Sequence, residues 1–119
     1  MKPILIVCLV GSIGYFGCNE VLERPLENDH VTLVAPANNL VSDTTIQSFY
    51  WQPIDSGINY ELQVVSPRFD SIAMVVVDTV TGAHLLYLSL SPALYQWRVR
   101  AFNSSSTTSF SNIWTLTVQ

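Results

Sequence analysis

Residues 94–101 have the sequence Leu94-Tyr95-Gln96-Trp97-Arg98-Val99-Arg100-Ala101, and this stretch decides the fold. From Tyr95 onward every second residue is apolar, and the positions between them hold one glutamine and two arginines. Successive side chains of a β-strand point to opposite faces of the sheet, so a period of two predicts a strand with one face in a core and one in water. We therefore expect a half-buried strand here, in an antiparallel sheet.

Six further segments after residue 30 have the apolar content or the alternation of strands, and turn residues separate them. They are residues 31–35, 47–52, 59–65, 72–77, 85–90 and 114–119. Residues 37–45 and 103–109 are rich in Asn, Ser and Thr and are predicted to be loops, and Ser66-Pro67-Arg68 is predicted to end the third strand. Seven short strands at this spacing, with no helical periodicity, predict an all-β sandwich of two antiparallel sheets. The predicted core is Phe49, Trp51, Tyr60, Leu62, Val64, Leu88, Leu90, Trp97, Val99 and Leu116.

Tyr95 follows a Leu90-Ser91-Pro92 turn, which is the setting of a tyrosine corner, where the phenol hydrogen-bonds back to the preceding loop. With this motif, residues 31–119 resemble a fibronectin type III domain. The resemblance rests on Trp51 in the second strand, Tyr60 in the third, Leu90 before the corner and Tyr95 at the start of the sixth. It implies a seven-stranded immunoglobulin-like sandwich and is nearly silent about function.

The first seventeen residues are predicted to be a signal peptide. After Lys2, the segment from Ile4 to Phe16 is an apolar run of thirteen residues. As a helix it would span roughly 20 Å, which is short of the ~30 Å hydrocarbon core of a membrane. The run ends in Gly17-Cys18, which resembles the lipobox of bacterial lipoproteins, in which the cysteine is acylated and becomes the mature N-terminus. An ordinary secretory signal with an incidental cysteine is the alternative.

Residues 18–30 are acidic, contain a proline and show no sustained periodicity, which is typical of a flexible tether from a lipidated Cys18. Asn19 stands where an aspartate would retain many lipoproteins in the inner membrane, so the resemblance favours the outer membrane. A lipid-anchored chain with Pro36 after Leu33-Val34-Ala35 and a Trp-Arg-Val-Arg-Ala strand resembles small surface lipoproteins of certain Gram-negative bacteria. No cofactor is implied.

Composition and spacing argue against several classes of function. The net charge of −4 with a single lysine argues against nucleic acid binding, which needs a basic surface. The only histidines, His30 and His84, fall in the tether and in a turn, so no nucleophile–histidine pair is indicated and we expect no enzyme. No metal site is expected either, because the carboxylates do not have the spacing of a calcium loop. Those of the predicted domain are Asp43, Asp55, Glu61, Asp70 and Asp78.

A protein interaction module is the leading prediction, and Ile72–Val77 is the candidate edge. This segment is apolar at every position, so only alternate residues are needed for the core. The face left over is Ala73, Val75 and Val77, or else Ile72, Met74 and Val76. An uncovered apolar edge of this kind suits strand addition or apolar contact with another protein.

Two other functions stay open at this point. A glycan-binding accessory lipoprotein of a polysaccharide-capture system would use exposed aromatic residues, for which Tyr50, Tyr87 and Phe102 are the candidates. A structural subunit of an envelope assembly is the other. Separately, Asp43-Thr44-Thr45, Asp70-Ser71-Ile72 and Asp78-Thr79-Val80 resemble acceptor sites for O-glycans in some Gram-negative bacteria.

Overall fold

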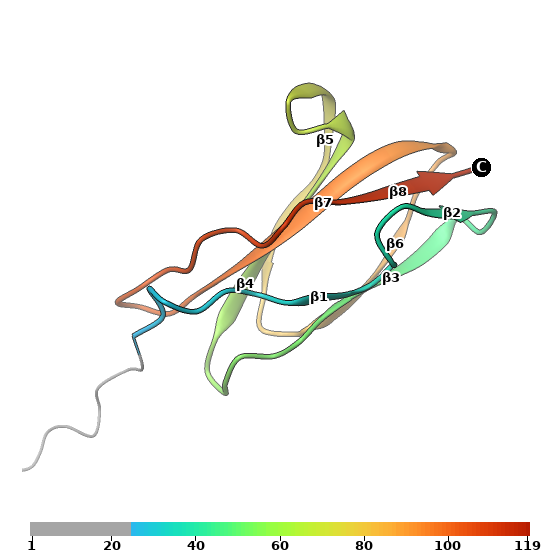
Figure 1. Ribbon diagram of the computed structural model, residues 1–119. Coiled ribbons are helices and arrows are strands. Elements are labelled where there is room, and N and C mark those ends of the chain that lie inside the picture. The colour runs from blue at the N-terminus through green and yellow to red at the C-terminus, as the bar shows by residue number, and fades with distance from the viewer. Residues whose placement is uncertain (1–24) are drawn as a thin grey trace, which may run out of the picture.

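The computed structural model describes residues 25–119, which form a sandwich of two β-sheets (Figure 1). The smaller sheet has the strand order β1-β3-β6 and the larger has the order β2-β8-β7-β4-β5. In chain order the strands are β1 (Leu33–Ala35), β2 (Leu40–Ser42), β3 (Ile46–Trp51), β4 (Asn59–Arg68), β5 (Ser71–Thr81), β6 (Leu85–Ser89), β7 (Ala93–Phe102) and β8 (Trp114–Val118). The predicted two-sheet, all-β architecture is confirmed. The signal peptide and Cys18 lie outside the described residues, and residues 25–119 contain no helix able to cross a membrane.

The core lies between the two sheets and follows the alternation predicted for β7. Tyr95, Trp97, Val99 and Ala101 all point inward, and each is at most 4% exposed. Of the ten predicted core residues, nine are buried, and Leu88 is half-buried and packs against them. The centre of the core is aromatic: Phe49 meets Trp97 edge-on with ring centroids 5.0 Å apart, and Trp51 packs on Tyr60 at 5.7 Å.

Two buried tyrosines use their hydroxyl groups to hold the chain around them. The Tyr95 hydroxyl donates a hydrogen bond to the Ser91 carbonyl, which confirms the predicted tyrosine corner. The Tyr60 hydroxyl accepts one from the Ile54 amide at 3.0 Å, which fixes the loop after β3. Burial raises the pKa of the Tyr95 phenol, because the charged phenolate is poorly solvated in the core.

The strand count and the ends of two strands differ from those predicted. Residues 25–119 form eight strands, because Leu40–Ser42, inside a predicted loop, pairs in parallel with β8. β4 continues through Pro67 as far as Arg68. A proline is tolerated there because pairing of β4 with β7 ends at Val65, so no partner on that side needs an amide from residue 67. β5 runs on to Thr81, past the Asp78 that was expected to close it.

The packed domain also begins earlier than residue 31. Leu26, which falls in the expected tether, is fully buried in the core, and its amide donates to Ser106 Oγ at 3.0 Å. The Asp29 amide bonds back to the Leu26 carbonyl at 2.9 Å, so a turn precedes β1. The segment 25–30 is therefore part of the folded unit.

Candidate interaction surface

The strand predicted to be an interaction edge does lie at the edge of a sheet. β5 pairs only with β4, so its other side has no neighbouring strand within the larger sheet. Ile72, Met74 and Val75 are 48%, 61% and 58% exposed, and Val80 near the other end of the strand is 58% exposed. An apolar strand that is open along one side can pair with a strand of another chain.

The predicted face Ala73, Val75 and Val77 is not continuous. Val64 lies opposite Val77 while Val65 lies opposite Val75, so Val76 is an extra residue in a β-bulge. The bulge interrupts the alternation, and both Val76 and Val77 are half-buried against the core. Ala73 lies at a second irregularity, because Ser66 lies opposite Met74 while Pro67 lies opposite Ile72. Ala73 and Val75 are exposed, so the open part of β5 before Val76 is residues 71–75.

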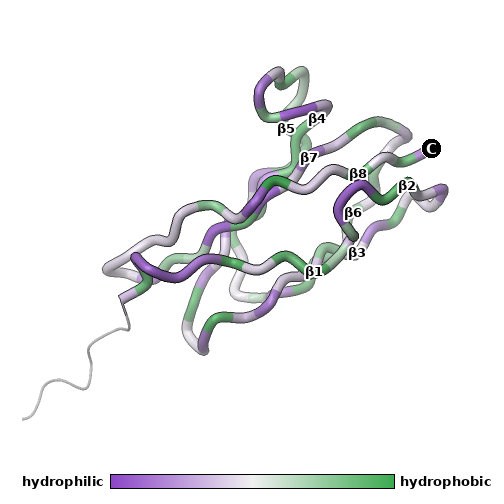
Figure 2. Tube along the Cα trace, viewed as in Figure 1, coloured by the Kyte–Doolittle hydropathy of each residue, from purple (hydrophilic) through white to green (hydrophobic). Residues whose placement is uncertain are grey.

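The turn between β4 and β5 folds back over the outer face of the larger sheet. Figure 1 shows the chain curling where β4 leads into β5, and Figure 2 shows hydrophilic residues in this curl. The Phe69 amide donates to Gln96 Oε1 of β7 at 2.9 Å, and Ser66 Oγ donates to the Leu94 carbonyl at 2.7 Å. These two bonds fix the hairpin against β7.

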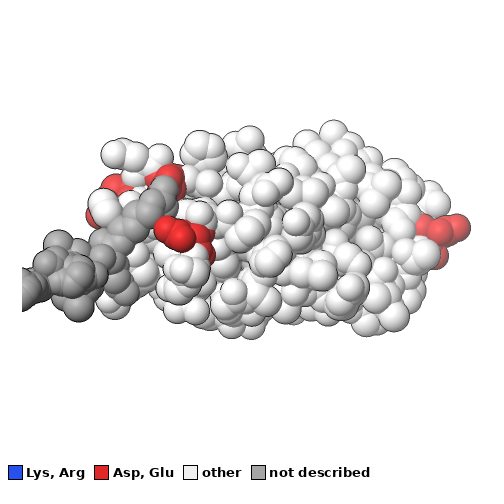
Figure 3. Space-filling view, turned by 90° about the horizontal axis from the view of Figure 1, so that it is seen from below, with Lys and Arg blue, Asp and Glu red and all other residues white. Residues whose placement is uncertain are grey.

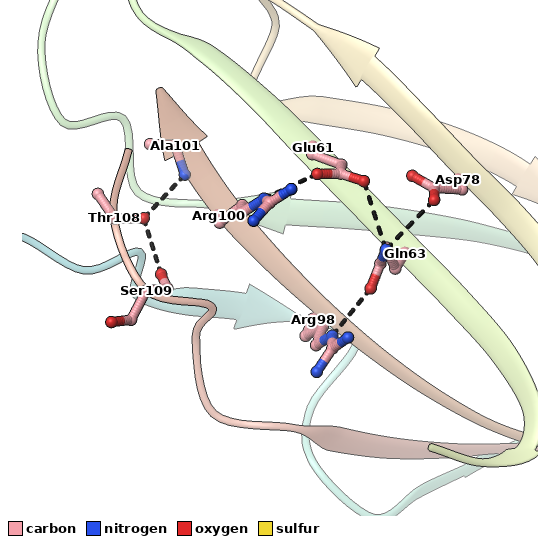
Figure 4. A network of polar contacts seen from close by, with 8 residues as sticks. All are labelled: Glu61, Gln63, Asp78, Arg98, Arg100, Ala101, Thr108 and Ser109. Atoms are coloured by element: carbon pink, nitrogen blue, oxygen red, sulfur yellow. Dashed lines mark hydrogen bonds and ion pairs between the residues drawn. The ribbon is translucent and has the colours of Figure 1, made fainter. Parts of the chain in front are cut away.

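A chain of polar side chains crosses the outer face from β5 through β4 to β7 (Figure 4). Arg100 Nε donates to Glu61 Oε1 at 2.8 Å in an ion pair. Gln63 Nε2 donates to Glu61 Oε2 at 3.3 Å and to Asp78 Oδ2 at 3.2 Å. Arg98 Nε donates to Gln63 Oε1 at 2.9 Å. Because the register places Gln63 opposite both Arg98 and Asp78, these contacts follow directly from strand pairing.

Arg98 is also enclosed by two aromatic rings. Its Cζ lies 4.3 Å from the centroid of Phe69 and 4.0 Å from that of Phe110, and Arg100 Cζ lies 4.5 Å from the same Phe110 ring. The β7 alternation predicts that both arginines point outward. Sequence reasoning missed the stack, because Phe69 and Phe110 belong to a turn and a loop whose paths no periodicity reveals.

The aromatic residues proposed for glycan stacking are divided between the two sheets. Tyr50 and Tyr87 share the outer face of the smaller sheet, because the register pairs Tyr50 with Leu85 and Ser48 with Tyr87. Tyr87 is 66% exposed, and Tyr50 is half-buried beside His84, with ring centroids 5.5 Å apart. Phe102 instead lies on β7 and lines a shallow hollow of about 290 Å³.

The outer face of the smaller sheet carries no charge on its strands. The outward positions of β3 and β6 hold Ile46, Ser48, Tyr50, Leu85, Tyr87 and Ser89. Figure 3, which looks from the side on which β1 and β3 lie in Figure 1, shows no Lys or Arg and acidic residues only towards the two ends. This face is apolar and neutral, whereas the outer face of the larger sheet is rich in charge.

Within residues 25–119, no three His, Cys, Asp or Glu side chains gather where they would hold a metal ion. His30 lines a hollow of about 470 Å³ between β1 and the segment before β8, and His84 packs beside Tyr50 with the ring planes tilted by 51°. Of the three possible O-glycan acceptors, Thr44 and Ser71 are exposed and Thr79 is half-buried.

No protein-family model and no curated protein matches this sequence. Among solved structures, the chain is similar to a solution structure of the fibronectin type-III domain of human fibronectin type III domain containing protein 3. The TM-score is 0.53 at 18% sequence identity, and the match covers 88% of this chain and 92% of that one. The likeness shows a fibronectin type III-like fold.

Proposed function

We propose that this chain is a non-catalytic interaction module that binds another protein at the outer membrane, through strand addition on β5. The observation that carries the proposal is the open side of β5, where Ile72, Met74 and Val75 are each about half exposed or more. Added strands gain affinity from backbone hydrogen bonds and specificity from alternate side chains. The fold agrees with this role, because fibronectin type III-like domains commonly serve as binding modules.

The lipid anchor belongs to the same proposal and rests on the sequence alone. An apolar run of thirteen residues ends at Gly17-Cys18, and acylation of Cys18 would hold the domain at the membrane. Stable anchoring needs more than one acyl chain, which bacterial lipoproteins have. Growth with labelled palmitate should tag the wild-type protein and leave Cys18→Ser untagged. Membrane fractionation of the Cys18→Ser protein identical to wild type would contradict this part of the proposal.

The edge is tested by photo-crosslinking in the cells that make the protein. A photoreactive residue at position 75 should form a crosslink to a protein, and one at position 87, which is equally exposed on the other sheet, should not. Met74→Lys should abolish the position-75 crosslink, because a charge on the exposed edge opposes strand addition. Equal crosslinking from both positions, or a crosslink that Met74→Lys leaves unchanged, would refute edge docking.

A matched pair of substitutions separates docking from folding. Val75→Lys replaces a side chain that is 58% exposed and should leave the melting temperature within a few degrees of wild type. Val76→Lys places a charge at a bulge position that packs against the core, so it should lower the free energy of unfolding by several kcal/mol. If both variants unfold, residues 72–77 are ordinary core.

Glycan binding is the second candidate function, and the neutral outer face of the smaller sheet favours it. An exposed tyrosine, Tyr87, on an uncharged face suits stacking against an uncharged sugar ring. Tyr87→Ala should then remove binding to a neutral oligosaccharide in a glycan array, while Phe102→Ala on the other sheet should not. An array in which wild type binds no glycan would exclude this candidate.

A further inference from the structure

Arg98 differs from the other two arginines of the described domain in having no carboxylate partner. Arg68 pairs with Asp70 at 3.3 Å and Arg100 with Glu61 at 2.8 Å. Arg98 contacts only the amide oxygen of Gln63 and the faces of two phenylalanine rings. Its positive charge is therefore not neutralised by a direct ion pair within residues 25–119.

The guanidinium of Arg98 is held in one orientation before any ligand arrives. Phe69 and Phe110 stack on it at 4.3 and 4.0 Å, and the bond from Nε to Gln63 Oε1 fixes its rotation. Phe69 is itself fixed by the bond from its amide to Gln96. An arginine that is already ordered loses little side-chain entropy when it binds, so each hydrogen bond it then forms contributes more to affinity.

The edge of the guanidinium that carries Nη1 and Nη2 remains open. Arg98 uses Nε for its hydrogen bond, and neither Nη atom has an acceptor among residues 25–119. In Figure 4 the dashed line from Gln63 ends at Nε, and a terminal nitrogen of Arg98 points away from Gln63. Two parallel N–H donors in a plane match the two oxygens of a carboxylate, which can accept both hydrogen bonds at once.

The neighbouring charges restrict what kind of anion fits. Glu61 and Asp78 lie on the same face, and both accept hydrogen bonds from Gln63. Because Arg100 pairs with Glu61, Arg98 is the one arginine on this face, within residues 25–119, that has no carboxylate partner. A polyanion would bring further negative charges against these two acids. A partner that presents a single carboxylate would not.

We propose that Arg98 is the anchor of a binding site for one carboxylate side chain of a protein partner, received by Nη1 and Nη2. This inference rests on the proposed function, because Arg98 lies on the outer face of the sheet whose edge is β5. A strand added to β5 would extend this sheet but lie three strand spacings, roughly 14 Å, from β7, so the carboxylate would come from a segment of the partner that crosses the outer face. Arginine is also enriched among the residues that dominate binding energy at protein interfaces.

The test is an NMR titration that observes the Arg98 Nε–Hε signal of protein expressed from the full chain. The probe is a blocked pentapeptide of threonine and valine with one central glutamate, and its glutamine counterpart is the control. The glutamate peptide should shift the Arg98 signal saturably, and the glutamine peptide should not. Arg98→Lys keeps the charge but loses the planar fork, and it should weaken binding about tenfold. Arg68→Lys, at the exposed hairpin tip, should bind as wild type does.

Several outcomes would overturn the inference. The first is an Arg98 signal that does not respond to the glutamate peptide. The second is a loss of peptide affinity in Arg68→Lys as large as that in Arg98→Lys. The third is tighter binding of trigalacturonate than of the peptide, which would make the ligand a glycan. If Arg98→Lys does not fold, the wild-type signal still decides the question. Val75→Lys should leave the peptide titration unchanged. Crosslinking at position 75 without a response of Arg98 would remove this inference and leave the edge proposal standing.

Discussion

Trp97 provides a sharp test of the core, because two substitutions at this position should have very different costs. The side chain is fully buried and meets Phe49 and Trp114 edge-on, with ring centroids 5.0 and 6.0 Å away. Trp97→Ala removes these contacts and leaves a cavity, at a cost of about 3–5 kcal/mol. Each lost aromatic pair adds roughly 0.5–1.5 kcal/mol, which places the expected loss at the upper end of that range. Small domains are stable by only about 5–15 kcal/mol, so this loss removes roughly a third or more of the total stability.

Trp97→Phe should be nearly neutral for a reason that is specific to this core. The indole Nε1 is buried without a hydrogen-bond partner, and an unpaired buried donor costs roughly 1–3 kcal/mol. Phenylalanine removes that donor and keeps a ring against Phe49, while the smaller ring gives up on the order of 1–2 kcal/mol of burial. The two terms nearly cancel, so we expect a change within about 1 kcal/mol of wild type.

Urea denaturation followed by circular dichroism measures both variants without depending on tryptophan fluorescence. Trp114→Phe is the control, because Trp114 is only half-buried and its indole is not an unpaired buried group. If Trp97→Phe costs as much as Trp97→Ala, the argument from the unpaired indole N–H is wrong. In that case the size of the indole ring alone would determine the stability of the core.

Three further outcomes can be measured with the same denaturation assay. Tyr95→Phe removes the hydrogen bond to the Ser91 carbonyl and should cost about 1–3 kcal/mol, and an unchanged midpoint would mean that the corner contributes nothing. Because the pKa of Tyr95 is raised by burial, the unfolded chain loses the phenol proton first. The contribution of Tyr95 to the free energy of unfolding should therefore be constant below pH 10 and be lost above it, and Tyr95→Phe should lack this loss. Ser111→Ala removes the buried hydroxyl that accepts from the Val99 amide at 3.0 Å and should cost about 1–3 kcal/mol, whereas Ser109→Ala, at an exposed position, should cost less than about 0.5 kcal/mol.

The parts of the fold that sequence could predict are those where one physical signal dominates. The alternation in residues 94–101 and the corner tyrosine identified β7, its buried face and the antiparallel sheet. The same signal failed for Ile72–Val77, where every residue is apolar and a bulge at Val76 removes the alternation. A bulge depends on the register between two strands, and a single strand's sequence does not contain that information.

The missed features depend on contacts between distant segments. Leu26 is an isolated apolar residue in an acidic segment, and only the folded domain shows the space that it fills. The loop before β8 seemed to be a polar connection, yet its Thr108 and Ser111 hydroxyls accept hydrogen bonds from the β7 amides of Ala101 and Val99. Serine and threonine are as common in solvated loops as in such roles, so composition alone does not distinguish the two.

The first two strands belong to different sheets, and this has a consequence for how the domain opens. β1 pairs with β3 in one sheet, and after a short turn β2 pairs with β8 in the other. Asn39 and Asn38 fasten that turn to Thr115 with two hydrogen bonds of 2.8 Å, so the crossing itself is fixed. Detaching β1 or β2 therefore disturbs an edge strand of each sheet at the same time. Amide protons of β3 and of β8 should exchange with solvent at matching rates, through one shared opening of the molecule, where two independently fraying sheets would give two separate rates.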